Sequence, residues 1–222
     1  MLPPALHDPA LFVAAALLLN LTPGPDMLLV AGTSAAHGPR AGVWAALGVG
    51  LGCLFHMVLA ALGVSALLAA SPWAFAGLKA LGGAYLVWMG WGLLRPQACA
   101  RGEVSAGRMP MAVPMGAARA FWQGALTNAL NPKVALFFMA FLPQFITPDQ
   151  PGQTLAFVLL GAAFNLSGTL VNMAVAVLSF RMGALLRSGS GGGSGRAAAR
   201  WVQRGAGALF VGLGLKLALG SR

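Results

Sequence analysis

Acidic side chains are almost absent from this sequence: its 222 residues include only four Asp and Glu, against 14 Lys and Arg. Charged residues of both signs make up 8% of the chain, whereas soluble domains carry about 25%. Residues 41 to 78 and 150 to 180 contain no Asp, Glu, Lys or Arg. A soluble domain with so few charges could not cover its surface, so lipid must solvate part of it. The shortage of charge therefore predicts a polytopic membrane protein.

Few groups are available for catalysis or metal binding: four acidic residues, three histidines and two cysteines. Cys53 and Cys99 belong to no disulfide or metal-binding pattern, so we expect two unpaired thiols. No hydrolase, kinase or metal constellation can be assembled from this set. We therefore predict no enzyme and no metal or cofactor site. The net charge of +10 does not predict a nucleic-acid partner, because the basic residues fall between apolar segments rather than along one soluble face.

What the sequence does contain is six apolar segments of membrane-spanning length. They are Ala10–Ala36, Ala41–Leu68, Ala74–Leu94, Arg119–Phe145, Thr154–Leu178 and Ala198–Leu219. A basic loop over residues 96–118 separates the third and fourth segments, and a glycine-serine linker near residues 188–196 precedes the sixth. The chain thus divides into residues 1–95, with three spans, and residues 119–222, with three more.

The basic residues predict the orientation of these spans. With six spans, ten arginines fall in the connections on one side of the membrane and three basic residues on the other. The positive-inside rule places the ten in the cytoplasm, so both termini should face outward. No Lys or Arg precedes the first apolar run, which we therefore interpret as a retained helix rather than a signal peptide.

Two of the apolar segments carry a polar, proline-containing interruption. In the first, "NLTPGPDMLL" supplies Asn20, Thr22, Pro23, Gly24, Pro25 and Asp26. In the fourth, "TNALNPKVAL" supplies Asn128, Asn131, Pro132 and Lys133. A proline removes a backbone donor and clashes with the preceding turn, so each helix should break at its prolines.

The two interruptions align with each other, Pro25 over Pro132 and Asp26 over Lys133. In the same register, "GAYLVWMGWGLL" of the third segment lies over "GALFVGLGLKLA" of the sixth. An odd number of spans in each half means that the second half enters the membrane from the opposite face. The sequence thus predicts an all-α membrane protein of six transmembrane helices, built as two inverted three-helix repeats with helices 1 and 4 broken, as in secondary transporters.

Asp26 and Lys133 are charges of opposite sign at equivalent positions in these repeats. A charge deep in the bilayer costs on the order of 3 kcal/mol, so both residues are expected to face a cavity and to hold a zwitterionic solute. Two simpler interpretations stay open. Asp26 could stabilise the N-terminus of a helix after the break, and Lys133 could extend to a lipid headgroup.

Other polar residues of the membrane segments also have two interpretations. Asn165, Thr169 and Asn172 share one helix face, where they either bond to other helices or form a cavity wall. Histidine titrates near physiological pH, so His56 could relay protons, although a bond to a neighbouring helix is the commoner role. Faces rich in glycine, such as that of Gly48 and Gly52, predict close helix packing and are compatible with a homodimer.

Three stretches resemble the LysE/RhtB family of amino-acid exporters. They are "NLTPGPDMLLVAGTSAAHGPRAGVWAALGVGLG", "FWQGALTNALNPKVALFFMAFLPQFI" and "GGAYLVWMGW". The resemblance covers nearly the whole chain and implies a small bacterial inner-membrane exporter of threonine, homoserine, leucine or related metabolites, driven by the proton gradient. It places the family's broken-helix motifs on the residues of the two interruptions. The glycine-serine linker departs from the family pattern.

A transporter of this kind would use Asp26 and Lys133 to hold substrate or exchange protons, with Asp26 as the candidate protonation switch. The alternative is a membrane thiol–disulfide conduit, which can share the three-plus-three plan but needs a cysteine pair at symmetric mid-membrane positions. Cys53 and Cys99 are not symmetry mates, so the sequence favours the exporter. The residues leave the substrate, the coupling ion and the oligomeric state open.

Overall fold

The computed structural model describes residues 3–70, 115–147 and 150–187, with isolated positions between 77 and 94 and between 208 and 212. The predicted spans Ala74–Leu94 and Ala198–Leu219 lie almost wholly outside the described residues, as do the linker and most of the basic loop. In the described ranges the chain forms six α-helices and no strand, apart from one isolated bridge between Leu6 and Ile146. An all-helical fold was the prediction, and it is confirmed for this part of the chain.

The helices fall into two long elements and two bent pairs. They are α1 (Pro9–Leu21), α2 (Pro25–His37), α3 (Pro39–Ala70), α5 (Ala117–Ala129), α6 (Pro132–Leu136) and α7 (Gln153–Arg187), with a π-helix η1 (Phe137–Phe141) and a 3₁₀-helix η2 (Leu142–Phe145) after α6. In the described residues, α3 over Pro39–Leu62 and α7 over Gln153–Arg181 are each long and apolar enough to cross a membrane. The α1–α2 pair is bent by 48° and the pair from α5 to Phe145 by 50°, which gives up to four spans if each pair counts as one.

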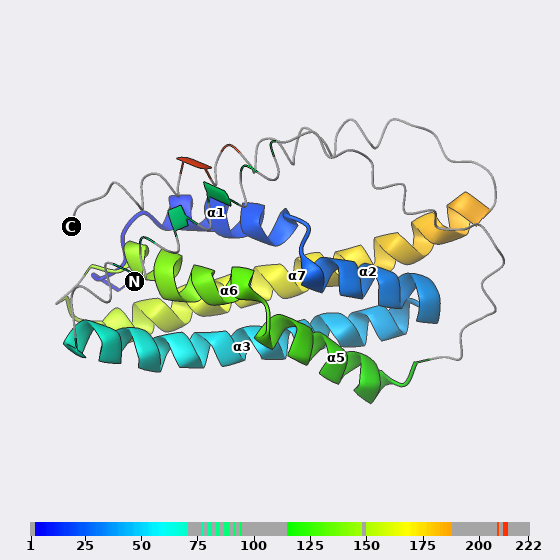
Figure 1. Cartoon of the computed structure of the whole chain (residues 1–222), viewed down its shortest axis with the longest axis horizontal. Helices are drawn as coiled ribbons and strands as arrows, with labels where there is room; N and C mark the ends of the chain where they lie inside the picture. Colours follow the sequence, from blue (N-terminus) through cyan, green and yellow to red (C-terminus); the bar gives the residue numbers. More distant parts are fainter. Residues whose placement is uncertain are drawn as a thin grey trace.

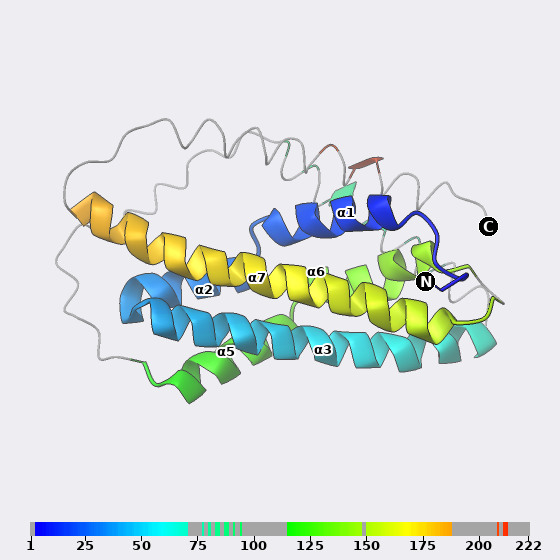
Figure 2. The ribbon, with the colours of Figure 1, turned by 180° about the vertical axis from the view of Figure 1, so that it is seen from behind.

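The described helices run along the long axis of one elongated bundle (Figure 1). Gly38, with φ 93°, makes the tight turn that sends α3 back along α2. Figure 2 shows α7 crossing the whole length of the bundle, with α1 on one side of it and α3 on the other. α5 packs against α3, and α1, α2 and α3 all contact α7. This arrangement brings the α1–α2 break and the α5–α6 break to the middle of the bundle.

The bundle has two hydrophobic cores of different composition. The core near the N-terminus and η2 is aromatic, and its rings come from α1, η1, η2 and α7: Phe12, Phe137, Phe138, Phe141, Phe145, Phe157 and Phe164. The core at the other end, where α2 meets α3, consists of small residues: Val30, Ala41, Ala45, Ala46, Val49, Ala120 and Ala176. Large apolar side chains also point outward, among them Leu28, Leu62 and Leu130. An outer surface of this kind suits lipid rather than water.

The closest approach in the bundle is between α3 and α5. A Cβ placed on Gly48 would lie 1.9 Å from the Phe121 carbonyl oxygen, and one on Gly124 would lie 2.1 Å from the Ala45 carbonyl oxygen. Any side chain at either position would overlap the backbone of the other helix. Glycine is therefore what lets these two helices meet backbone to backbone, as small residues do in membrane bundles.

Candidate functional site

The first break lies between α1 and α2. The helical pattern ends at Leu21, where the backbone N–H of Thr22 still bonds the carbonyls of Leu18 and Leu19. Pro23 has no N–H to continue the pattern, and Pro25 occupies the first position of α2, where no N–H is needed. The last carbonyl groups of α1 consequently lack partners within the helix and can accept hydrogen bonds from neighbouring elements.

The second break has the same construction. α5 ends at Ala129, and α6 begins at Pro132 after the N-cap residue Asn131. The Asn131 side chain accepts a hydrogen bond of 3.0 Å from the backbone N–H of Lys133, which caps the new helix. Lys133 and Asp26 are therefore each the second residue of a helix that begins with a proline.

Asp26 is buried, and its carboxylate is bound by the opposite break rather than by its own helix. Oδ2 accepts hydrogen bonds from Asn128 Nδ2 at 2.9 Å and from Asn131 Nδ2 at 2.8 Å. The residue also lies in the first turn of α2, where the positive end of the helix dipole favours a carboxylate. Asp26 thus lies at a helix N-terminus, as in the simpler interpretation. Its hydrogen bonds, however, connect the two helix pairs across the bundle.

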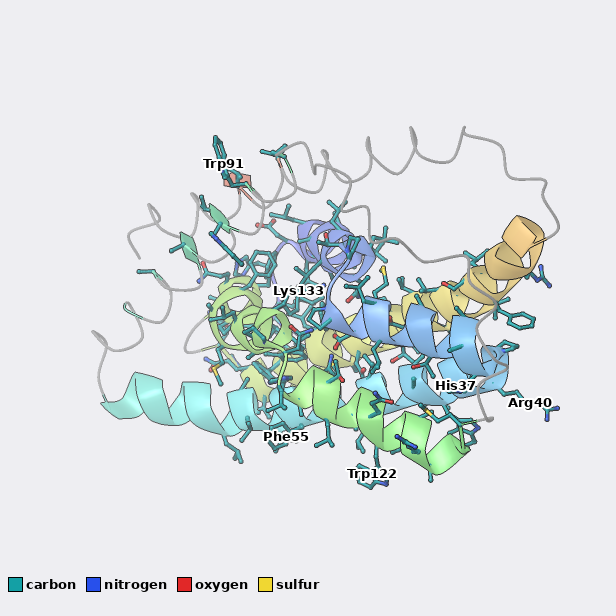
Figure 3. The ribbon with its side chains drawn as sticks, turned by 45° about the vertical axis from the view of Figure 1, so that its right-hand side comes forward. His37, Arg40, Phe55, Trp91, Trp122 and Lys133 are labelled. Carbon is teal, nitrogen blue, oxygen red and sulfur yellow. The ribbon has the colours of Figure 1, made fainter. Side chains whose placement is uncertain are left out.

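Lys133 makes the reciprocal connection. Its ammonium donates to the backbone carbonyls of Leu19 at 3.1 Å and Thr22 at 3.0 Å, the carbonyls that the first break leaves exposed. A Cβ on Gly24 would lie 3.1 Å from Lys133 Nζ, so the glycine gives the ammonium room. Figure 3 shows Lys133 in the middle of the bundle, whereas Phe55 and Trp122 point outward. The ammonium therefore binds protein groups at the break instead of extending to the membrane surface.

A small cavity of about 30 Å³ lies where the two breaks meet α3 and α7. Eight of the predicted site residues line it: Asn20, Thr22, Asp26, Asn128, Lys133, Asn165, Thr169 and Asn172. A water molecule needs about 10–15 Å³ of such volume, so the cavity is polar, has room for a small group and cannot contain a whole amino acid.

One wall of the cavity is the polar face of α7. Asn20 joins α1 to this wall by donating to Ser167 Oγ at 3.0 Å and to the Phe164 carbonyl at 3.3 Å. A Cβ on Gly168 would lie 2.9 Å from Asn20 Oδ1, so that glycine admits the Asn20 side chain. Asn165, Thr169 and Asn172 line the cavity, and the side-chain bonds of Thr169 and Asn172 stay within α7. The interhelical bonds of this wall go instead to Ser167 and the Phe164 carbonyl.

Other predicted residues lie beside the cavity without lining it. His56 is buried, and its Nε2 lies 2.8 Å from the Asn128 carbonyl oxygen, which anchors α3 to the end of α5. Asn131 does not line the cavity but is hydrogen-bonded to the Asp26 carboxylate and to the backbone N–H of Lys133. The helix-breaking prolines Pro23, Pro25 and Pro132 are exposed and shape the backbone, while Gly24 acts through the space it leaves.

Six lining residues did not stand out in the sequence: Met27, Val49, Cys53, Val134, Phe164 and Gly168. Five of them are apolar or weakly polar side chains in apolar helices, where no local signal separates a cavity wall from a lipid-facing position. Gly168 could have been found, because it lies three residues after Asn165 and four before Asn172 on the polar face of α7.

Cys53 is the buried free cysteine of the described residues. Cys99 lies outside the described residues. A thiol–disulfide conduit needs a cysteine pair, and nothing in this site supports one. Nor do the described residues bring three His, Cys, Asp or Glu side chains together as metal ligands.

The family model described as "LysE type translocator" matches residues 17–221. An uncharacterized membrane protein of Pseudomonas aeruginosa is 37% identical over 212 residues, which are 93% of each chain. A homoserine/homoserine lactone efflux protein of Salmonella typhimurium is 32% identical over 79% of this chain and 82% of its own. A leucine efflux protein of Salmonella choleraesuis is 31% identical over 70% and 71%. No solved structure matches the chain.

Proposed function

Because this chain belongs to the LysE type translocator family, we propose that it is a secondary transporter that exports an amino acid or a close relative from the cytoplasm across the bacterial inner membrane. The relatives named for efflux of homoserine, homoserine lactone and leucine support this substrate class. All three compounds are small and carry a primary amine next to a carbonyl group. Family and relatives together indicate a transporter rather than an enzyme.

The observation that carries the proposal is the polar cavity at the meeting point of two helix breaks. Asp26 and Lys133 both line it, so it offers one carboxylate and one ammonium in the interior of an apolar bundle. Ionisable groups at such a depth are expensive and are normally retained for a substrate or an ion. Broken helices near mid-membrane are also where secondary transporters bind their substrates.

The proposed architecture is six spans in two inverted three-helix repeats, of which helices 1 and 4 are broken. It is supported by the two bends of 48° and 50°, each followed by a helix that begins with a proline. The register of the sequence halves supports it further, because it pairs Asp26 with Lys133. With the basic connections in the cytoplasm, His37 and Arg40 lie at the inner end of the bundle and η2 at the outer end.

The size of the cavity implies a conformational change in the transport cycle. A volume of about 30 Å³ does not accommodate an amino acid with its side chain, so the helices around the cavity must move apart to admit one. The aromatic core closes the bundle on the proposed outer side and the core of small residues closes it on the inner side. Alternating access would open one core at a time.

We propose that transport is coupled to protons through Asp26. A carboxylate that accepts a proton loses the charge that attracts a cationic substrate group, so proton and substrate would occupy Asp26 in turn. Exchange of an outgoing amino acid for incoming protons is the simplest cycle that uses this competition. It takes place within one chain or within each chain of a homodimer.

The test compares export by the wild type, Asp26→Asn and the control Asp8→Asn in cells loaded with labelled dipeptides that yield leucine or homoserine. Asp8 is an exposed carboxylate at the N-cap of α1, far from the cavity. We expect Asp26→Asn to lower the initial export rate at least about tenfold, since a lost charge-assisted contact is worth roughly 1.5–3 kcal/mol. Asp8→Asn should export normally. Equal rates in all three proteins would remove Asp26 from the mechanism, and no export by the wild type would reject the substrate class.

A further inference from the structure

Three buried side-chain oxygens have no hydrogen-bond partner among the residues that the structure describes. They are Asp26 Oδ1, Asn128 Oδ1 and Asn172 Oδ1. Their side chains are 7%, 2% and 8% exposed, so water outside the bundle does not reach them. A buried polar atom without a partner destabilises the fold, and native proteins rarely leave one at random. The three residues that carry these atoms line one cavity, which makes that cavity the candidate ligand site.

The two amide oxygens are fixed in orientation by the bonds of their own nitrogens. Asn128 Nδ2 donates to Asp26 Oδ2 at 2.9 Å, and Asn172 Nδ2 donates to the Gly168 carbonyl at 3.0 Å. Turning either amide over would place its oxygen against another oxygen. Each Oδ1 is therefore the free end of its amide, and each is an acceptor.

All three residues line the same cavity, two of them from the paired breaks and Asn172 from the facing wall of α7. Each of the three unpaired oxygens can accept a hydrogen bond, and one of them belongs to a carboxylate. An ammonium group supplies three N–H donors and a positive charge. We propose that these oxygens form a receptor for the primary ammonium of the exported substrate, and that this group, rather than the carboxylate, is what the protein recognises.

The opposite charge in the cavity is less available. Lys133 donates two of its three N–H groups to the Leu19 and Thr22 carbonyls, so one is left for a substrate carboxylate. The site therefore has three acceptors for the cationic end of a substrate against one charged donor for the anionic end. Its substrate class is the primary amines, whether or not they carry a free carboxylate.

This inference rests on the proposed export function for its biological meaning but is tested by binding alone. The full chain is purified in detergent, and its thermal unfolding is followed against increasing ligand, since a ligand that binds the folded state raises its stability. Two matched sets of probes are used. One is L-leucine, 3-methylbutylamine and N-acetyl-L-leucine; the other is L-homoserine, its lactone and N-acetyl-L-homoserine. Sodium chloride at matched ionic strength is the inorganic cation.

In at least one set we expect the amino acid and its carboxylate-free analogue to stabilise the protein at concentrations within about tenfold of each other. The N-acetyl compound should need an at least about 100-fold higher concentration for the same stabilisation. A site built to bond a polar group of the substrate rejects an analogue that lacks this group. Stabilisation by N-acetyl compounds at the same concentration would overturn the inference. Stabilisation by sodium alone, or by no compound, would overturn it as well.

Two Asn172 variants and one control variant assign the effect to the site. Asn172→Leu should weaken binding of the amine at least about tenfold. Gln144→Leu is the matched control, because the Gln144 amide also donates to the carbonyl four residues earlier, away from the cavity. Asn172→Ala serves the same purpose with a smaller side chain, and unchanged binding in a folded Asn172 variant would contradict the assignment.

Counterflow in proteoliposomes separates the failure of the export function from the failure of the ammonium receptor. Binding of the amine without transport rejects only the export function. Transport with equal competition by N-acetyl compounds rejects only the receptor.

Discussion

Asn131 is the most fully used side chain of the site. Its Nδ2 binds the Asp26 carboxylate, and its Oδ1 binds the backbone N–H of Lys133. One amide thus holds the carboxylate of the first break and starts the helix after the second. No other residue type has a donor and an acceptor at this separation on so short a side chain, except aspartate in its protonated form.

Asn131→Ala removes both functions at once. Loss of a helix N-cap costs roughly 0.5–2 kcal/mol and loss of a hydrogen bond to a carboxylate roughly 1.5–3 kcal/mol. We expect the free energy of unfolding, measured by denaturant titration in mixed micelles, to fall by about 2–4 kcal/mol. Thr147→Ala, which removes only an exposed contact to His7, should change it by less than about 0.5 kcal/mol. A loss no larger than that of the control would show that the two bonds do not stabilise the fold.

The helix breaks were predictable because proline acts locally. Pro23, Pro25 and Pro132 each exclude one backbone bond whatever surrounds them, and the two interruptions they mark are where α1 and α5 end. The partners of Asp26 and Lys133 were not predictable in the same way. Opposite charges at equivalent positions suggested a pair, but their hydrogen bonds go to amides and carbonyls, which only the packed helices bring within reach.

The contact between α3 and α5 allows a test on two helices. Gly48→Ala places a methyl group 1.9 Å from the Phe121 carbonyl oxygen, and backbone cannot move aside as a flexible side chain can. We expect the free energy of unfolding to fall by about 1–3 kcal/mol or more, the usual cost of overpacking. Gly32→Ala in α2 meets nothing within 4 Å and should be neutral or slightly stabilising, because alanine favours helix. Equal stability of the two variants would contradict the backbone contact.

The segment after Lys133 shows where sequence patterns stop being informative. The run FFMAF is apolar throughout, so it carries no periodicity that distinguishes an α-helix from the π-helix found there. The ring of Phe137 stacks on that of Phe164 at 4.1 Å. Phe164 in turn forms part of the cavity wall, a role that depends on how η1 and α7 pack rather than on either sequence alone.

The proposed orientation gives a prediction for the whole molecule. In a Cys53→Ala, Cys99→Ala background, cysteines are introduced at Asp8, before α1, and at Arg40, at the start of α3; both side chains are exposed. With basic connections in the cytoplasm, a membrane-impermeant maleimide should label Asp8→Cys in spheroplasts and Arg40→Cys only after permeabilisation. The reverse pattern would invert the proposed topology and exchange the inner and outer cores.

The membrane environment was the most predictable property of the molecule, because it follows from composition. So few charges could not cover a soluble surface, and the described helices accordingly expose large apolar side chains such as Leu62 and Leu130. Eight residues that line the cavity were singled out from the sequence, but its volume of about 30 Å³ was not predictable. That volume depends on how closely α7 packs against the two breaks.

The backbone contact between α3 and α5 restricts how the cavity can open. α3 belongs to the first half of the sequence and α5 to the second, yet Gly48 and Gly124 leave no gap between them into which substrate or water could pass. A motion that swung one half away from the other would have to break this contact in every cycle. We expect the two helices instead to stay together as one fixed scaffold, past which α1, α2 and α7 tilt. The hinges of transport would then lie within each half and not between them.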